Sequence, residues 1–339
     1  MTRSTSRTTG RPTLAEVARL SGVSPITVSR ALRGVATVAP ELVARVRAAA
    51  AELGYVANPA ARALASAQSQ SVVVLIPSLA NQLFVETLDA IHDVLRPRGL
   101  EVLIGNYHYD PAEEESLLRN YLACQPRGLL LTGLERSDGA RQLLAASPVP
   151  RVHMMELDSQ DGALCVGFSQ QDAGRAAARH LLARGRRRLG FIAAQLDPRV
   201  LQRADGFRQA LGAAGLHDPS LELMVPQPSS IGLGGELFSQ LLARHADLDG
   251  VFFCNDDLAH GALFQAQRQG IRVPEQVAMV GFNDLPASAH MVPRLTSIRT
   301  PLAAVGQHAA QALLDLLDGK GRRTAAHDLG FALMVRESS

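Results

Sequence analysis

The stretch 13–32 holds side chains suited to contacting DNA. An apolar helical face formed by Leu14, Val17, Ala18 and Leu20 ends at Ser21-Gly22-Val23, and a second short helix is expected to begin at Ser24 with Pro25 in its first turn. This second helix carries hydrogen-bond donors and apolar groups at Ile26, Thr27, Ser29 and Arg30. Two short helices joined by a glycine turn form a helix-turn-helix, whose second helix fits the DNA major groove. An ordinary helical hairpin with a solvated polar face is the alternative.

Residues with catalytic or metal-binding spacing are missing from the sequence. Its histidines are scattered, and neither a phosphate-binding loop nor a nucleophile elbow is present. The run Gly232-Leu233-Gly234-Gly235 precedes a helix but lacks the GxGxxG spacing of a dinucleotide site. We therefore expect no enzyme activity, no metal and no cofactor.

Basic charge is concentrated at the start of the chain, although the net charge of all 339 residues is only +2. Residues 1–64 contain nine arginines and three acidic residues, whereas the remainder contains 25 basic and 29 acidic residues. This split is typical of a nucleic-acid-binding module joined to a part that binds something else. The length predicts two or three domains.

The sequence favours a soluble, cytoplasmic protein. Residues 1–10 form a polar tail without the apolar segment of a secretory signal, and no apolar run approaches the ~20 residues of a membrane span. The cysteines Cys124, Cys165 and Cys254 are far apart in apolar surroundings, which predicts buried thiols in a reducing cytosol.

From residue 71 onward, short apolar runs alternate with helical segments. This pattern predicts parallel sheets covered by helices on both faces, arranged as two doubly wound subdomains with a crevice between them. The chain is expected to cross between the subdomains near residues 167 and 299, with a helix at 302–317 returning to the first. A third head helix is expected at 41–53. The Ala-rich stretch 58–65 predicts a short helix that is marginal without a partner.

The chain resembles the lactose-repressor (LacI) family of regulators. The likeness rests on ordered motifs that span residues 11 to about 331: Thr13-Leu14-Ala15-Glu16-Val17-Ala18, Leu53-Gly54-Tyr55-Val56-Ala57-Asn58-Pro59, Cys254-Asn255-Asp256-Asp257 and Gly281-Phe282-Asn283-Asp284. Stretches such as Gln227-Pro228-Ser229-Ser230 are similar to the gluconate-operon repressor branch. The resemblance implies a tail at 1–10, a DNA-binding domain at 11–57, a hinge helix and linker at 58–70, and an effector-binding and dimerisation body at 71–339.

The resemblance places DNA contacts on the second helix. Pro25 and Ile26 take the specificity-setting positions and can touch a thymine methyl, whereas Arg30 can donate to guanine. Thr27, Ser29 and Arg33 suit phosphates, although simple solvation also explains Thr27 and Ser29. The full set of expected DNA-contacting residues is Thr13, Ser24, Pro25, Ile26, Thr27, Ser29, Arg30, Arg33, Asn58 and Leu64.

In similar repressors, a paired hinge helix wedges an apolar side chain into the minor groove. Leu64 matches that position, and Asn58 would cap the helix. A plain linker at residues 58–71 is the alternative. Because paired heads read palindromic half-sites, the resemblance also implies a homodimer on a palindromic operator in double-stranded DNA.

The resemblance also implies a small-molecule effector in the crevice. It assigns Phe84 as an apolar wall, Glu156 as a hydroxyl acceptor and Arg203 as a partner for a carboxylate, with Asn255 and Asn283 from later strand ends. Family members that bind neutral sugars generally carry Asp where this chain has Asn283, so the pocket loses one negative charge. A structural ion pair for Arg203 and a strand-end cap for Asn255 are the alternatives.

The sequence therefore predicts a DNA-binding transcriptional repressor of gluconate-type catabolic genes, controlled by a sugar acid such as gluconate. A regulator that responds to 2-ketogluconate or another carbohydrate is the main alternative. A sugar-processing enzyme lacks its motifs, and a periplasmic solute-binding protein lacks a signal peptide and would leave the helix-turn-helix unexplained.

Overall fold

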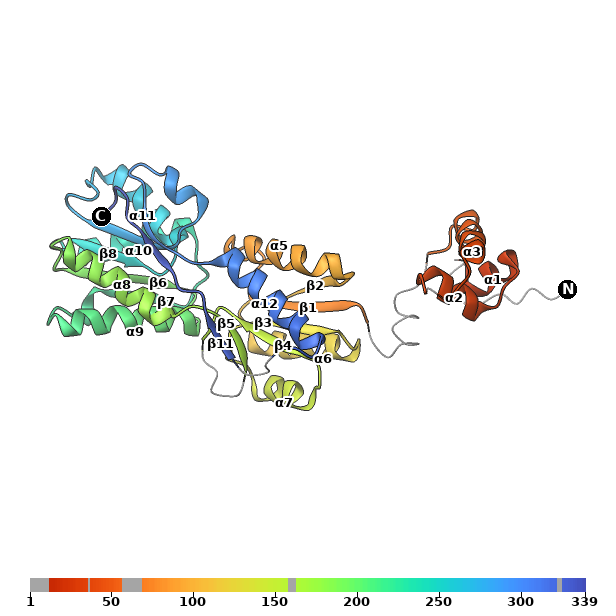
Figure 1. The fold of residues 1–339 in the computed structure, drawn as a ribbon. Coiled ribbons are helices and arrows are strands. Elements are labelled where there is room, and N and C mark those ends of the chain that lie inside the picture. The colour runs from red at the N-terminus through yellow and green to blue at the C-terminus, as the bar shows by residue number, and fades with distance from the viewer. Residues whose placement is uncertain (1–11, 36, 57–68, 158–162, 322–324) are drawn as a thin grey trace. The chain divides into compact units, whose positions relative to one another are not determined.

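The computed structural model describes residues 12–35, 37–56, 69–157, 163–321 and 325–339. The chain divides into two units, residues 1–69 and residues 70–339. We call the first unit the head and the second the body, and describe each separately (Figure 1).

The described head consists of three helices: α1 (Leu14–Ser21), α2 (Pro25–Leu32) and α3 (Pro40–Glu52). Thr13 opens α1 through a capping box, in which Glu16 Oε2 accepts from the Thr13 backbone N–H at 2.7 Å. Gly22 ends α1 with φ 67°, a left-handed conformation that favours glycine. The three helices bury small aliphatic side chains against one another, among them Val17, Val28 and Val46.

The body contains two six-stranded sheets, each with helices on both faces (Figure 1). The first subdomain holds β1 (Ser71–Ile76), β2 (Glu101–Asn106), β3 (Gly128–Thr132), β4 (Arg151–Met154), β5 (Leu164–Gly167) and β11 (Ala325–Asp328), in the order β11-β5-β4-β3-β1-β2. The second holds β6 (Leu189–Ala194), β7 (Glu222–Val225), β8 (Gly250–Phe253), β9 (Ala278–Asn283), β10 (Thr296–Arg299) and β12 (Ala332–Met334), in the order β12-β10-β9-β8-β6-β7. Within these described strands, every pairing is parallel except β10 with β12.

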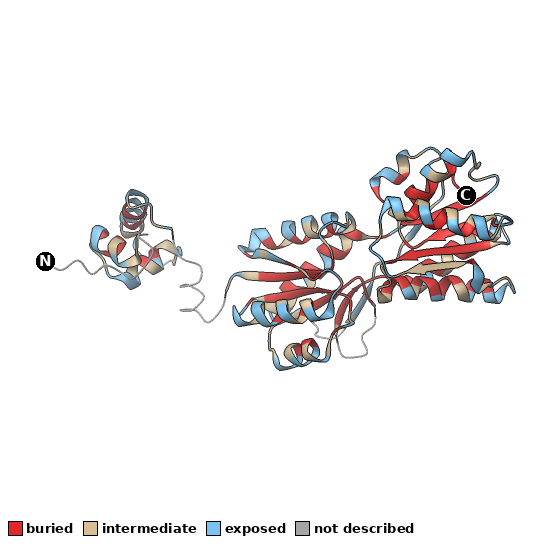
Figure 2. Cartoon of the chain, turned by 180° about the vertical axis from the view of Figure 1, so that it is seen from behind, coloured by how far each residue is buried: buried red, intermediate tan, exposed pale blue. Residues whose placement is uncertain are grey.

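Helices pack in pairs against each sheet. The first subdomain carries α5 (Leu83–Leu95) with α12 (Leu302–Leu317), and α6 (Pro111–Ala123) with α7 (Asp138–Ala146). The second carries α8 (Gln170–Ala183) with α9 (Pro198–Ala213), and α10 (Ile231–Arg244) with α11 (Asp256–Gln269). Figure 2 shows buried residues along both sheets and exposed residues on the outer sides of the helices. The prediction of a helical head and two doubly wound α/β subdomains is confirmed.

Three described segments carry the chain between the subdomains. The first joins β5 to α8 after Gly167, the second joins β10 to α12 after Arg299, and the third joins β11 to β12 across residues 329–331. We call these the first, second and third crossing segments. The sequence predicts crossings near residues 167 and 299, and the third segment was not expected.

The scarce aromatic side chains gather in the second subdomain. Phe191 and Phe252 lie with ring centroids 5.4 Å apart, and Phe282 lies 6.4 Å from Phe252. Close by, α8 and α9 approach each other through glycines: a Cβ added at Gly174 would lie 2.0 Å from the Arg203 carbonyl oxygen, and one at Gly206 would lie 1.8 Å from a carbonyl oxygen of α8. This contact brings the start of α9 against the start of α8.

Two details differ from expectation. Leu20 was placed on the apolar face of α1 but is 46% exposed, because Ser21 takes the buried place and donates its hydroxyl to the Val17 carbonyl at 2.6 Å. Cys124 is exposed, whereas Cys165 and Cys254 are buried. Within the described residues, no helix has the length and apolar character to span a membrane, and no cluster of three or more His, Cys, Asp or Glu side chains could hold a metal ion.

Candidate functional site

Helix α2 presents the predicted DNA-contacting side chains. Ser24 caps the helix by accepting from the Thr27 backbone N–H at 3.2 Å, and its hydroxyl lies 2.9 Å from that of Thr27. Pro25, Ile26 and Arg30 are exposed, with Ile26 67% exposed although it is apolar. An apolar side chain held open beside a cation is suited to touching bases in a groove.

The other predicted DNA-contacting residues have different surroundings. Thr13 is engaged in the capping box, and Arg33 is exposed with its Nε donating to the Ser29 carbonyl at 3.1 Å. Asn58 and Leu64 lie outside the described residues, so the hinge helix stays a prediction.

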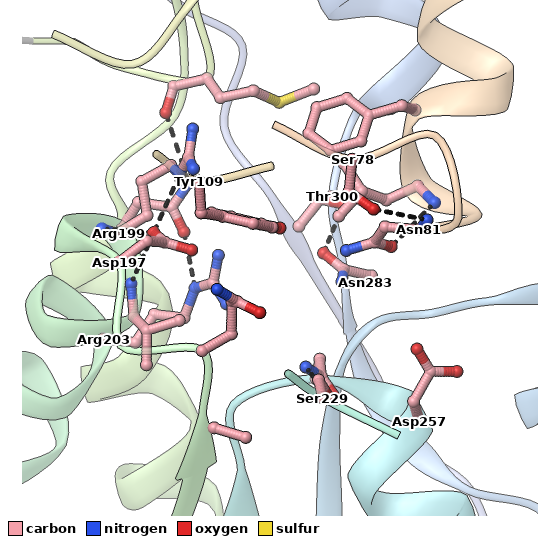
Figure 3. A pocket seen from close by; sticks show the side chains of 18 of the residues that line it. Ser78, Asn81, Tyr109, Asp197, Arg199, Arg203, Ser229, Asp257, Asn283 and Thr300 are labelled. Atoms are coloured by element: carbon pink, nitrogen blue, oxygen red, sulfur yellow. Dashed lines mark hydrogen bonds and ion pairs between the residues drawn. The ribbon is translucent and has the colours of Figure 1, made fainter. Parts of the chain in front are cut away.

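A cavity of about 190 Å³ lies between the subdomains, where the carboxyl ends of their strands face each other (Figure 3). The first subdomain supplies residues that follow β1 and β2, and the second supplies the start of α9 and the residues that follow β8, β9 and β10. The structure brings four of the five predicted effector residues together in its lining: Phe84, Arg203, Asn255 and Asn283. Ligands of open α/β sheets bind at such strand ends.

Arg203 is a buried cation whose hydrogen-bond partners are neutral, although the charge of Asp197 also acts on it. Its Nε donates to the Gln170 side-chain oxygen at 2.8 Å, and its Nη1 donates to the Cys254 carbonyl at 2.7 Å. The guanidinium carbon lies 3.8 Å from the centroid of the Phe282 ring. Burial lowers the pKa of Arg203, and within the described residues no carboxylate forms an ion pair with it. The described residues therefore give no support to the alternative of a structural ion pair.

A second arginine, Arg199, lies one helical turn before Arg203. Asp197 caps α9, and its Oδ1 accepts from the Arg199 Nε at 3.1 Å. Burial acts to lower the pKa of Arg199, but the charge of Asp197 and of nearby phenol and carboxyl groups raises it overall. Figure 3 shows Asp197, Arg199 and Arg203 together on one side of the cavity. This wall offers two guanidinium groups, one of which is already paired.

The opposite wall carries several neutral polar groups and one carboxyl group, that of Asp257. Figure 3 shows Ser78, Asn81, Asn283 and Thr300 there, with the Tyr109 ring between the two walls. Tyr109 has φ 59°, an uncommon conformation for a bulky residue that turns its ring into the cavity. Burial raises the pKa of its phenol, which therefore stays protonated and can donate a hydrogen bond at neutral pH.

The two asparagines combine structural and lining roles. Asn255 caps α11 by accepting from the Leu258 backbone N–H at 3.0 Å, as its alternative interpretation predicted, and its amide donates to Ser229 at 2.8 Å. Asn283 ends β9 with φ 100° and faces Thr300, whose hydroxyl lies 3.5 Å from the Asn283 Oδ1.

Glu156 does not line the cavity. The preceding residue, Met155, adopts φ 67° and itself faces the cavity, while the Glu156 backbone packs so closely on Gly167 that a Cβ there would lie 2.4 Å from the Glu156 nitrogen. The buried Glu156 side chain reaches Gln202 at 3.5 Å, and burial raises its pKa to about 7. The assignment of Glu156 as a direct hydroxyl acceptor is not supported by this position.

Comparison with known proteins identifies both units. Residues 13–58 match the family model "Bacterial regulatory proteins, lacI family", and residues 178–339 match "Periplasmic binding protein-like domain". The chain is 68% identical over 333 residues to the HTH-type transcriptional regulator GntR of Pseudomonas aeruginosa, covering 98% of this chain and 97% of that protein. It belongs to the LacI family of transcriptional regulators.

Two more distant relatives agree. This LacI-family regulator is 37% identical over 323 residues to GntR of Escherichia coli K12, covering 95% of this chain and 97% of that protein. It matches the solved lac repressor dimer bound to operator and the anti-inducer ONPF with a TM-score of 0.84 and 26% identity, covering 97% and 99% of the two chains. The predicted DNA-binding repressor of the gluconate-operon branch is confirmed, and these relatives are regulators rather than enzymes.

Sequence reasoning about this LacI-family regulator missed several cavity residues, including Asp197, Arg199 and Tyr109. Arg199 was detectable, because residues four apart share a helix face and Arg203 was already assigned to the crevice. Asp197 had the form of an ordinary helix cap before Pro198. Tyr109 depends on a left-handed turn that its side chain does not favour, so no sequence signal indicated it.

Proposed function

We propose that this repressor binds a small sugar acid such as gluconate in the cavity, and that the bound acid controls its affinity for operator DNA. The observation that carries the proposal is Arg203. A buried cation whose protein partners are all neutral gains most from a ligand that brings a negative charge. A carboxylate is a planar acceptor that matches the guanidinium group.

The other polar groups of the cavity suit a polyhydroxylated chain. Amides and hydroxyls can each donate and accept, as alternating sugar hydroxyls require, and the opposite wall provides Ser78, Asn81, Asn283 and Thr300. An amide at position 283 adds no negative charge that would repel an acid. Phe84 supports the binding of the ligand's carbon backbone, because it is apolar and almost fully buried in the cavity wall.

Control of DNA binding follows if the sugar acid prefers one arrangement of the two subdomains. In the proposed dimer, that arrangement sets the spacing of two hinge helices on a palindromic operator. Arg30 and Ile26 would read base edges, Arg33 would hold phosphate, and Leu64 would wedge the minor groove. A regulator that responds to 2-ketogluconate or another carbohydrate is the second candidate, since Arg203 fits the carboxylate of 2-ketogluconate as well as that of gluconate.

Calorimetric titration of the full chain tests the proposal. We expect binding of gluconate, 2-ketogluconate or 6-phosphogluconate and none of the matching neutral sugars. The acid that binds should also change the affinity for an operator found by selection from random DNA. Binding of neutral sugars or purines alone would overturn the sugar-acid assignment, and a bound acid without effect on operator affinity would overturn the control.

A further inference from the structure

The residue after Asn283 is a buried carboxylate held by two arginines from elsewhere in the chain. Asp284 has a side chain only 3% exposed. Its Oδ2 lies 2.8 Å from the Arg299 Nε, and its Oδ1 lies 2.6 Å from the Arg336 Nη1. Asp284 itself does not line the effector cavity, whereas its neighbour Asn283 does.

Both arginines lie next to strands that a crossing segment leaves or enters. Arg299 is the last residue of β10, directly before the second crossing segment leads to α12. Arg336 follows β12, the strand that the third crossing segment enters, and its Nη1 also donates to the Leu295 carbonyl at 2.6 Å. One carboxylate thus joins the turn that carries Asn283 to the end of β10, which the second crossing segment leaves, and to the residues after β12, which the third segment enters.

This turn has an uncommon backbone that other contacts hold in place. Asn283 and Asp284 have φ 100° and 54°, both in the left-handed region. The Asp284 backbone N–H donates to the Ser297 hydroxyl at 3.1 Å, and that hydroxyl donates to buried Asp256 at 2.7 Å. Backbone of this kind is strained in residues other than glycine and persists only where the surroundings fix it. A ligand that moves Asn283 therefore acts on a turn with few alternative conformations.

We propose that Asp284 is a positioning residue that transmits effector binding at Asn283 to the second and third crossing segments. The proposal rests on the proposed function, because it needs an effector in the cavity. Thr300 supports it, since this residue lies in the second crossing segment, lines the cavity and faces Asn283. A movement of Asn283 on ligand binding and a movement of the crossing segments would then both act on the Asp284 ion pairs.

The test compares Asp284→Asn with the wild type and with Glu337→Gln. Glu337 is the control because it is next to Arg336 in the sequence, and its carboxylate forms an exposed ion pair with Arg294 at 2.8 Å. For each full-length protein, operator affinity is measured without gluconate and at saturating gluconate, and gluconate affinity is measured by calorimetry. We expect Asp284→Asn to bind operator and gluconate within about threefold of the wild type, but to lose at least about four-fifths of the gluconate-induced change in operator affinity. Glu337→Gln should match the wild type.

A second variant and a second readout keep the outcomes decisive. Arg299 is 54% exposed, so Arg299→Gln should fold even if Asp284→Asn does not. Hydrogen exchange without any ligand should rise in residues 296–301 of this variant and in both 296–301 and 332–336 of Asp284→Asn. An unchanged gluconate response, or unchanged exchange in these segments, would overturn the role of Asp284. If the wild type ignores gluconate, the proposed effector is wrong, and the exchange result still decides whether Asp284 holds the segments.

Discussion

Replacement of Arg203 by methionine should separate effector binding from stability. Methionine keeps an unbranched apolar stem but removes the guanidinium group, which lies over the Phe282 ring and lines the cavity. Truncating one member of a buried, hydrogen-bonded charge pair typically costs about 2–5 kcal/mol of binding free energy. A loss of about 2–4 kcal/mol weakens the dissociation constant for a sugar acid roughly 30- to 700-fold.

The same substitution should change the free energy of unfolding much less, because two effects of opposite sign partly cancel. The variant leaves the Gln170 side-chain oxygen and the Cys254 carbonyl without their donor, which costs about 1–3 kcal/mol for each acceptor that stays dry. It also removes a buried cation that has no acidic partner, which recovers desolvation free energy. We expect the free energy of unfolding to change by less than about 2 kcal/mol.

Calorimetry with gluconate and urea unfolding measure the two quantities. Arg208→Met is the matched control, because Arg208 lies on the same helix and pairs with Glu222 at 2.6 Å outside the cavity lining. Its gluconate affinity should equal that of the wild type. Wild-type affinity in a folded Arg203→Met protein would refute the reasoning that the cavity recognises an acid through this guanidinium.

Three further predictions concern other parts of the chain. Because burial raises the pKa of Glu156 from 4.5 to about 7, its carboxyl destabilises the fold progressively as pH rises through that window. In urea unfolding, the free energy of unfolding of Glu156→Gln should therefore exceed that of the wild type by roughly 1–3 kcal/mol at about pH 8 and by little at about pH 5. A difference that does not depend on pH would contradict the raised pKa of Glu156. Gly206→Ala should lower the free energy of unfolding by about 1–3 kcal/mol, because the added methyl group overpacks against α8. Gly212→Ala on the same helix has open space around it and should raise the free energy of unfolding by about 0.5–1 kcal/mol. Thermal unfolding of both variants checks this prediction, and equal effects would disprove the close approach of α8 and α9. In DNA-binding titrations, Arg30→Met should weaken operator binding by about 1–3 kcal/mol and relax specificity at one base position. Arg33→Met should weaken binding by a similar amount on every DNA sequence. If both variants lose affinity in the same way across sequences, Arg30 does not contact a base.

Elements with local causes were predictable from the sequence. The start of α2 follows from the Ser24 cap and Pro25, and that of α6 from Asp110 and Pro111. Buried strands such as β3 and β8 were visible as apolar runs because both of their faces are covered. In each case, the residues that decide the structure lie within a few positions of the element itself.

Elements fixed by distant partners were not predictable. Strand β11 has largely exposed residues and no apolar run, and β12 takes only three residues of the short apolar run 331–335. Each strand is extended because it pairs with a strand far away in sequence. The same reason applies to the missed cavity residue Tyr109 and to the misplaced Glu156. Whether a side chain faces the crevice depends on how two subdomains meet and on single left-handed residues such as Met155.

The order of the edge strands affects how the body is made. Strand β11 completes the first sheet and β12 the second, so neither sheet is finished until residues 325–334 have left the ribosome. Domains of most two-part proteins can mature one after the other during synthesis, but here both subdomains await the same terminal stretch. A chain cut short before it would expose the edges of β5 and β10 together, and open strand edges pair readily with other chains. Premature termination would therefore yield an aggregation-prone fragment rather than one intact subdomain.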